Sequence, residues 1–372
     1  MISNELNYFI RLTALTIVGF MIASITTTKV IYMALGERPI EAIESPIMMA
    51  KETAARANPS INHLFVGSSA TWRQIDPLAF DSSVAAGIGS YSFNLGNDGL
   101  YPMRSVSYLE HLIETLPDRI EVIFFELYAL DGLSFNYNSP ELMRITNLGN
   151  FVDVAETILK ANFPHRAKLH LLFEYLRSFL SKSMGFGLVS YQQFERDLPL
   201  MHAERLSRTP RGFYAKDVEL GETTFYDNRA KLMEVGSVIQ KQPELLQNRR
   251  AAHIEKYKRA WNLDPNPFAN KLQQLLGRAQ ARGIRLIYFV PPLLTPAGIS
   301  FAYPTFLLMP EGSRLDLSDP AKLPEVYEAD NVFDLEHVNS HGAAFLSRYF
   351  AEEYSRLLRK DYQPDKSVDP SN

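Results

Sequence analysis

The stretch His63-Leu-Phe-Val-Gly-Ser-Ser-Ala-Thr-Trp72 is the most informative about the fold. Its first four residues have the pattern of a short buried strand, which Gly67 ends, and two serines stand where a helix would begin. Strand, glycine and helix start in this order are typical of the strand-to-helix turns of parallel α/β sheets. Side chains at such a turn lie at the carboxyl edge of the sheet, where α/β proteins place their ligand sites.

The rest of the chain repeats this alternation of strands and helices. Apolar and β-branched runs predict further strands, and apolar residues at helical spacing predict the helices that connect and follow them. The predicted strands are residues 63–67, 90–96, 120–127, 284–290 and 332–333, and the predicted helices are an alanine-rich lead-in at 38–60, then 103–116, 268–282 and 341–358. This order predicts an α/β protein with a mostly parallel sheet, in a flavodoxin-like three-layer α/β/α arrangement.

Residues from about 131 to 265 interrupt this alternation. We interpret them as a helical insertion within one domain that spans 38–360, followed by a disordered tail at 361–372. Within the insertion, an apolar face at 169–180 favours packing against the core over a membrane-lying or partner-binding helix; its residues are Leu172, Leu176, Phe179 and Leu180.

The N-terminal segment contains LTALTIVGFMIASITTT, which has no charged side chain between Arg11 and Lys29. As a helix this run spans about 26 Å, slightly less than a bilayer core, and the apolar residues 30–35 extend it. Residues 21–26 form a poor cleavage site, so we predict an uncleaved membrane anchor at 1–37 instead of a cleaved signal peptide. The expected protein is single-pass in the inner (cytoplasmic) membrane, with its domain on the periplasmic or extracytoplasmic side.

Composition narrows the possible functions. The 372 residues carry a net charge of −4, so no cationic excess is available to bind nucleic acid. The absence of cysteine excludes disulfides, thiolate metal sites and cysteine nucleophiles. Gly87-Ile-Gly89 lacks the third glycine of a dinucleotide fingerprint, and we expect no cofactor.

Two segments far apart in the sequence supply the residue types of an activated serine. Ser69 stands at a helix start, whose backbone N–H groups suit an oxyanion, although a serine there is also an ordinary N-cap. Asp334 and His337 are three residues apart, so the carboxylate can hold Nδ1 and leave Nε2 to accept the serine proton. The alternative for this segment is a metal site with His337 and His341 as ligands, which we do not favour.

Three motifs carry a family resemblance: Gly67-Ser-Ser69, Asn94-Leu-Gly96-x-x-Gly99 and Asp334-x-x-His337-x-Asn339. In this order they resemble the SGNH (GDSL-type) hydrolases. More narrowly, they are similar to the membrane-anchored branch that modifies cell-envelope polymers, which includes proteins of alginate O-acetylation and of D-alanyl transfer to teichoic acids. The resemblance covers residues of about 60–130 and 270–358.

The resemblance implies a nucleophile at Ser69, a general base at His337 and an orienting carboxylate at Asp334. It also implies oxyanion donors from the Ser69 N–H and from Gly96 or Gly99. The family's Gly-x-Asn-Asp motif is absent, and Phe-Phe-Glu126-Leu-Tyr stands in its place. Asn97 is then either the substitute side-chain donor or a turn-forming residue, and Glu126 is either a site carboxylate or a salt-bridged one.

The implied reaction is acyl transfer through a serine ester that ends on water or on a sugar hydroxyl. The expected protein is an O-acetyl or other O-acyl transferase, or an esterase, that acts on a cell-envelope glycan or exopolysaccharide beside a membrane-bound O-acyltransferase. The alternative is a non-catalytic, membrane-anchored scaffold or polysaccharide-binding subunit of an envelope polymer modification complex. A secreted lipase-like esterase is a third possibility.

Overall fold

The computed structural model describes residues 46–98, 100, 102–127, 164–183, 209–221, 267–292, 302–334 and 337–361, with most of 11–27, residue 30 and isolated positions at 152–160 and 248–255. In these residues one parallel sheet has the order β2-β1-β3-β4-β5. Its strands are β1 (His63–Val66), β2 (Ser92–Asn94), β3 (Val122–Glu126), β4 (Arg285–Val290) and β5 (Arg314–Asp316). This is one of the two common orders of doubly wound sheets. The predicted α/β class with a parallel sheet is confirmed.

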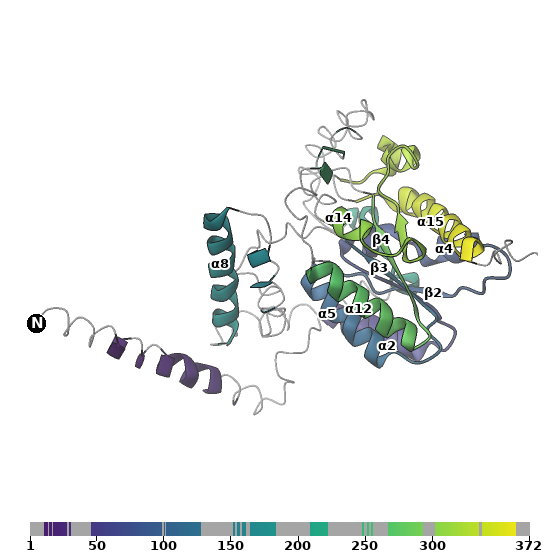
Figure 1. Ribbon diagram of the computed structural model, residues 1–372. Coiled ribbons are helices and arrows are strands. Elements are labelled where there is room, and N and C mark those ends of the chain that lie inside the picture. The colour runs from purple at the N-terminus through teal and green to yellow at the C-terminus, as the bar shows by residue number, and fades with distance from the viewer. Residues whose placement is uncertain are drawn as a thin grey trace, which may run out of the picture.

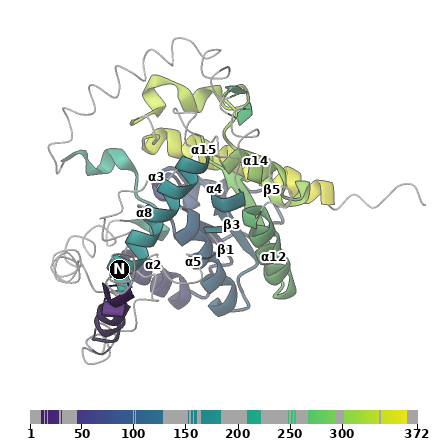
Figure 2. The ribbon, with the colours of Figure 1, turned by 60° about the vertical axis from the view of Figure 1, so that its left-hand side comes forward.

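Helices cover both faces of the sheet (Figure 1). On one face, α2 (Pro46–Ala57), α5 (Pro102–Thr115), α12 (Pro267–Ala281) and α14 (Ala302–Leu307) share a buried apolar cluster with the strands. On the other, α3 (Ser69–Gln74), α4 (Pro77–Ser83) and α15 (Ser340–Asp361) enclose a second cluster, in which the rings of Phe65, Phe124 and Phe350 are in contact. The two layers can be followed in the rotated view (Figure 2).

Most predicted elements occur with ends shifted by a few residues. The predicted strand at 332–333 is wrong, because Val332 forms only an isolated antiparallel bridge to Val338. The fifth strand is β5, whose three residues Arg-Leu-Asp lack the apolar run of a covered strand because they lie at the sheet edge. Helices α4 and α14 were not predicted. The predicted lead-in at 38–45 and the tail after residue 361 lie outside the described residues.

The predicted insertion contains α8 (His165–Ser183), which stands apart from the two helical layers (Figure 1). Of the apolar face that we interpreted as core, Leu176 is 40% exposed, whereas Leu172, Phe179 and Leu180 are half-buried. On the same helix, Leu169 and Phe173 are 68% and 62% exposed, and Tyr175 is buried. Helical spacing identifies an apolar face but does not determine what covers it.

The predicted anchor is described in part. Residues 11–13, 15, 16 and 18–27 have helical backbone. Among the helices of the described residues, none combines the length and the apolar character needed to cross a membrane.

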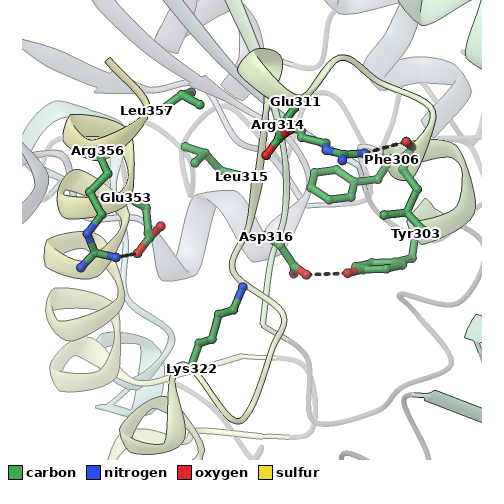
Figure 3. A pocket seen from close by; sticks show the side chains of 11 residues that line it. Tyr303, Phe306, Glu311, Arg314, Leu315, Asp316, Lys322, Glu353, Arg356 and Leu357 are labelled. Carbon is green, nitrogen blue, oxygen red and sulfur yellow. Dashed lines mark hydrogen bonds and ion pairs between the residues drawn. The ribbon is translucent and has the colours of Figure 1, made fainter. Parts of the chain in front are cut away.

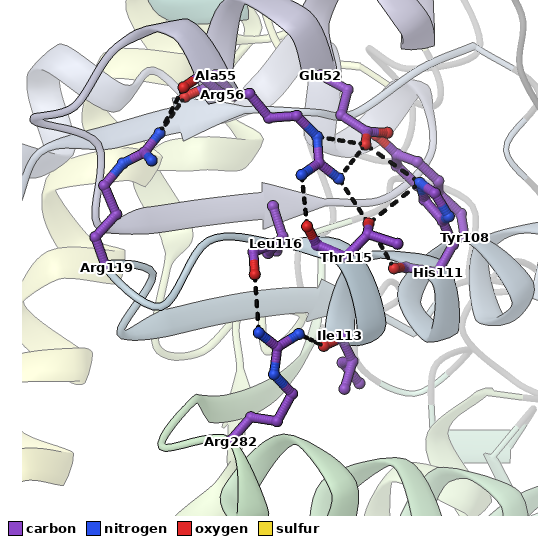
Figure 4. A network of polar contacts seen from close by, with 10 residues as sticks. All are labelled: Glu52, Ala55, Arg56, Tyr108, His111, Ile113, Thr115, Leu116, Arg119 and Arg282. Carbon is purple, nitrogen blue, oxygen red and sulfur yellow. Dashed lines mark hydrogen bonds and ion pairs between the residues drawn. The ribbon is translucent and has the colours of Figure 1, made fainter.

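A polar network joins α2 to α5 (Figure 4). Arg56 donates from Nε to Glu52 at 2.8 Å and from Nη1 to the Thr115 carbonyl at 2.6 Å, and His111 Nε2 lies 3.2 Å from Glu52. Burial alone would raise the pKa of Glu52, but the hydrogen bonds from His111 and Arg56 lower it below its ordinary value. Arg119 donates to carbonyl oxygens at the end of α2, including that of Ala55. These bonds attach the C-terminal half of α2 to α5 and to the segment that precedes β3.

His63 makes the fold sensitive to acid. Its Nδ1–H donates to Asn62 Oδ1 at 2.8 Å, and the Tyr354 hydroxyl donates to Nε2 at 3.3 Å, so the ring is held neutral. Burial lowers the pKa of His63 to about 4. The unfolded chain therefore binds a proton at this imidazole more tightly than the folded chain does. The contribution of neutral His63 to the unfolding free energy is fully present above its ordinary pKa of about 6.5, and it is lost as the pH falls toward 4.

We expect the unfolding free energy of the wild type to fall by about 3 kcal/mol between pH 6.5 and 4 because of His63 alone. In His63→Phe, which has no group to protonate at this position, this part of the pH dependence should be missing. Urea midpoints of both proteins from pH 7 to 4 measure the difference, in which the contributions of the shared carboxylates cancel. Parallel midpoint curves for the two proteins would contradict the prediction.

Candidate active site

The nucleophile candidate lies at the turn between β1 and α3. Ser68 is the N-cap of α3, and its hydroxyl oxygen accepts the Ala70 N–H at 3.1 Å. The ordinary capping role that a serine has at a helix start therefore belongs to Ser68. Ser69 is the first helical residue and is half-buried. Its hydroxyl is not used for capping.

Ser69, His337 and Asp334 form one chain of hydrogen bonds. The Ser69 hydroxyl lies 3.0 Å from His337 Nε2. On the other side of the ring, His337 Nδ1 lies 2.9 Å and 3.0 Å from the two carboxylate oxygens of Asp334. The His337 and Asp334 side chains are only 10% and 15% exposed. The structure thus brings Ser69 together with a pair of residues more than 260 positions later in the sequence, as the residue types had suggested.

The loop that carries the imidazole is held by its own hydrogen bonds. The Phe333 and Asp334 N–H groups donate to the His337 carbonyl at 2.9 and 3.1 Å, and the His337 N–H donates to Asp334 Oδ1 at 2.8 Å. Directly after it, Asn339 Oδ1 accepts the Gly342 N–H at 2.9 Å and so caps α15. Asp334 therefore orients His337 through both its ring and its backbone.

The predicted oxyanion donors differ in availability. The Ser69 N–H has no hydrogen-bond partner within the described part of the chain. The Gly96 N–H donates to Asn94 Oδ1 at 2.8 Å, so the prediction that it is an oxyanion donor is not met in this conformation. The Asn97 N–H donates to the Gly67 carbonyl, and the Asn97 carbonyl accepts from Leu100 N at 3.2 Å, as in a turn.

Gly99, the last predicted oxyanion donor, lies outside the described residues.

Glu126 contacts residues 67–71, the turn between β1 and α3 that carries Ser69 and that we call the nucleophile turn. Its carboxylate accepts from the Ser68 N–H at 3.0 Å, the Ser68 hydroxyl at 2.6 Å, the Thr71 N–H at 2.9 Å and the Thr71 hydroxyl. Among the described residues, these donors from Ser68 and Thr71 are its partners, and no cation pairs with it. Burial raises the pKa of Glu126, and these four donors oppose that rise. Glu126 is a carboxylate of the site that binds the turn on both sides of Ser69.

A buried cation, which the sequence analysis did not identify, borders the triad. The Arg73 guanidinium pairs with the half-exposed Asp98 at 2.7 Å and lies over the rings of Trp72 and Tyr214, 4.0 and 5.3 Å from their centroids. Burial alone would raise the pKa of Asp98, but Arg73 outweighs it and lowers the pKa, with smaller contributions from Lys216 and His337. Tyr214 comes from the predicted insertion, so part of that insertion packs against α3.

Two other features lie apart from the triad. His341 Nδ1 lies 2.6 Å from Asn331 Oδ1, and the described residues contain no group of three His, Asp or Glu side chains placed to hold a metal ion.

A pocket of about 440 Å³ lies between α14, β5 and α15 (Figure 3). None of the predicted catalytic residues lines it. Several of its charged groups are satisfied within the protein, since Asp316 accepts from the Tyr303 hydroxyl at 2.7 Å and Arg314 donates to the Leu307 carbonyl at 2.6 Å. This pocket is therefore separate from the triad.

The geometry determines what the triad can do chemically. A neutral imidazole whose Nδ1–H is held by a carboxylate presents Nε2 as a base to the Ser69 hydroxyl. The Ser69 N–H, which has no partner among the described residues, lies beside the oxygen that would attack, where negative charge would develop on a substrate carbonyl.

No protein-family model matches the chain, and no curated protein matches its sequence.

Proposed function

We propose that this protein catalyses serine-dependent acyl transfer. The observation that carries the proposal is the chain from Ser69 Oγ to His337 Nε2 at 3.0 Å and from His337 Nδ1 to Asp334 at 2.9 Å. It supplies a nucleophile, a general base and the group that orients the base.

In the proposed reaction, Ser69 Oγ attacks the acyl carbon of an ester while its proton passes to His337 Nε2. The Ser69 N–H donates to the oxygen that gains negative charge, and Asp334 stabilises the imidazolium. The tetrahedral intermediate then breaks its bond to the leaving alcohol, which takes the proton from Nε2. Water or a sugar hydroxyl next attacks the Ser69 ester and gives its proton to His337 Nε2. The second tetrahedral intermediate breaks its bond to Ser69 Oγ, which takes that proton back from Nε2, and the acyl group leaves on the water or sugar oxygen.

The substrate that we propose is a cell-envelope glycan or exopolysaccharide, with O-acetyl or another O-acyl group transferred or removed. The resemblance to SGNH hydrolases motivates this substrate, and the strand order β2-β1-β3-β4-β5, as in flavodoxin-like sheets, is compatible with it. A membrane-bound O-acyltransferase that supplies the acyl group is the proposed partner. The assembled triad favours an enzyme over the non-catalytic scaffold, which does not require this geometry.

We also propose that the chain is held at the inner membrane with its domain outside the cytoplasm. The described helical residues of the N-terminal segment expose large apolar side chains, including Leu15, Phe20 and Ile22. On α8, Leu169 and Phe173 are exposed in a helix with four Lys or Arg residues and one Glu. Exposed apolar residues together with basic ones suit a membrane surface.

One labelling experiment tests both the chemistry and the location. The full chain is produced in a bacterial host, and a fluorophosphonate probe that cannot cross membranes is added to spheroplasts and, separately, to lysed cells. We expect Ser69 to be labelled in both samples, with Ser69→Ala as the control. Labelling only after lysis would contradict the proposed location, and absence of labelling in both samples would contradict the proposed chemistry.

A further inference from the structure

Two buried charged side chains outside the triad flank the nucleophile turn. Lys51, on α2, is 0% exposed, and Glu126, at the end of β3, is 2% exposed. Burial lowers the pKa of the Lys51 ammonium well below its ordinary value and raises that of the Glu126 carboxyl, because neither charge is solvated by water. A buried charge is costly without polar partners, so the partners of these two groups need an explanation.

A continuous chain of hydrogen bonds joins the two groups through two peptide units. Lys51 Nζ donates to the Gly96 carbonyl oxygen at 2.5 Å. The same peptide unit carries the Asn97 N–H, which donates to the Gly67 carbonyl oxygen at 3.0 Å. That second peptide unit carries the Ser68 N–H, which donates to Glu126 Oε2 at 3.0 Å. Every step runs in the same direction, from the ammonium to the carboxylate.

This direction makes the bonds reinforce one another. The Lys51 donor lies at the carbonyl end of the first peptide unit, and the Glu126 acceptor lies at the N–H end of the second. Both groups therefore polarise the two units in the same sense, which strengthens the central bond between Asn97 and Gly67 in a medium of low dielectric constant. The central bond joins the Gly96–Asn97 loop to the Gly67–Ser68 turn, so the groups at the ends of the chain hold these two segments together.

The approach of the two loops depends on glycine at both peptide units. A Cβ on Gly67 would overlap Thr71 Oγ1 and the Glu126 carboxylate, and a Cβ on Gly96 would lie 2.5 Å from the Trp72 backbone nitrogen. Glu126 also binds Thr71 on the far side of Ser69, so both ends of the nucleophile turn are attached to the same chain.

We propose that Lys51 and Glu126 are positioning residues that act as one unit, holding the Gly96–Asn97 loop against the Gly67–Ser68 turn and thereby placing Ser69 for attack. Neither residue touches a reacting atom. The kinetic part of the test rests on the proposed function, whereas the stability part does not.

The test is a double-mutant cycle on the full chain with Lys51→Met, Glu126→Gln and the double variant. We expect each single variant to lower kcat for ester hydrolysis by about ten- to hundredfold with KM changed by less than about threefold, because a small displacement of the nucleophile affects the chemical step. The double variant should lose hardly more than the worse single variant, since breaking the chain once removes its effect. The same sub-additivity is expected in the unfolding equilibrium constant from urea titrations.

Glu52→Gln is the matched control. Glu52 is the neighbour of Lys51 on α2 and is also buried, but it binds Arg56 and His111 instead of the chain. Its replacement should lower the urea midpoint and leave kcat per folded molecule within about twofold. Lys51→Gln keeps an N–H donor near Gly96 and should recover part of the kcat lost in Lys51→Met. If Lys51→Met does not fold, Lys51→Gln replaces it in the cycle.

Two results would overturn the inference. The first is a double variant whose losses equal the product of the single losses in both kcat and the unfolding equilibrium. The second is a folded Lys51→Met that hydrolyses ester at the wild-type rate. If the wild type neither hydrolyses esters nor reacts with the fluorophosphonate, the proposed function fails, and the urea cycle alone then decides whether Lys51 and Glu126 act as one unit.

Discussion

Replacing Ser69 by alanine is expected to lower the rate of ester hydrolysis by about 10⁴-fold or more. The variant lacks the oxygen that attacks the acyl carbon, and only substrate binding and the Ser69 N–H donor remain. The hydroxyl bonds to His337 alone among the described residues, so its removal should leave the urea midpoint close to that of the wild type. Hydrolysis of p-nitrophenyl acetate by the full chain measures the rate.

The neighbouring serine provides a stringent control. Ser68→Ala removes a hydroxyl that caps α3 and donates to Glu126, so it should cost about 1 kcal/mol of unfolding free energy. Its hydrolysis rate should fall by no more than about tenfold. If Ser68→Ala is the inactive variant and Ser69→Ala hydrolyses normally, the assignment of the nucleophile is wrong.

Replacing Asp334 by asparagine is expected to lower hydrolysis by about 10⁴-fold, the loss that the same change causes in serine proteases. An amide group would donate to His337 Nδ1, which would then have to accept. The proton would move to Nε2, opposite the Ser69 hydroxyl, and the ring could no longer take the serine proton. The amide oxygen can still accept the His337 N–H, so the loop should keep its shape.

Asp330→Asn is the control for this substitution. Asp330 is exposed and lies just before the same loop. Its carbonyl accepts from the Asn339 amide at 2.6 Å, and its carboxylate has no partner among the described residues. This control should hydrolyse p-nitrophenyl acetate at the wild-type rate. The rate of Asp334→Asn is taken after the residual rate of Ser69→Ala has been subtracted. If this rate is less than tenfold below that of the wild type, Asp334 does not set the tautomer of His337.

Much of the sheet was predictable because its central strands are covered on both faces. β1, β3 and β4 must be apolar on both sides, and such strands are continuous runs in the sequence. β5 is the last strand of the described sheet and alternates polar with apolar residues over three positions, which is too short a pattern to identify. The Asp334–His337 pair was predictable for a different reason, since its geometry is set by a spacing of three residues.

The sequence by itself determined the α/β class and the candidate triad, because these depend on local patterns and on residue types at strand ends. Only the tertiary structure decided which polar groups remain available. It commits the Gly96 N–H to Asn94, buries Arg73 between Trp72 and Tyr214, and links Lys51 to Glu126. Each of these contacts joins residues far apart in the chain, and the physical reason is that a hydrogen bond depends on distance and direction in space, which no spacing along one segment contains.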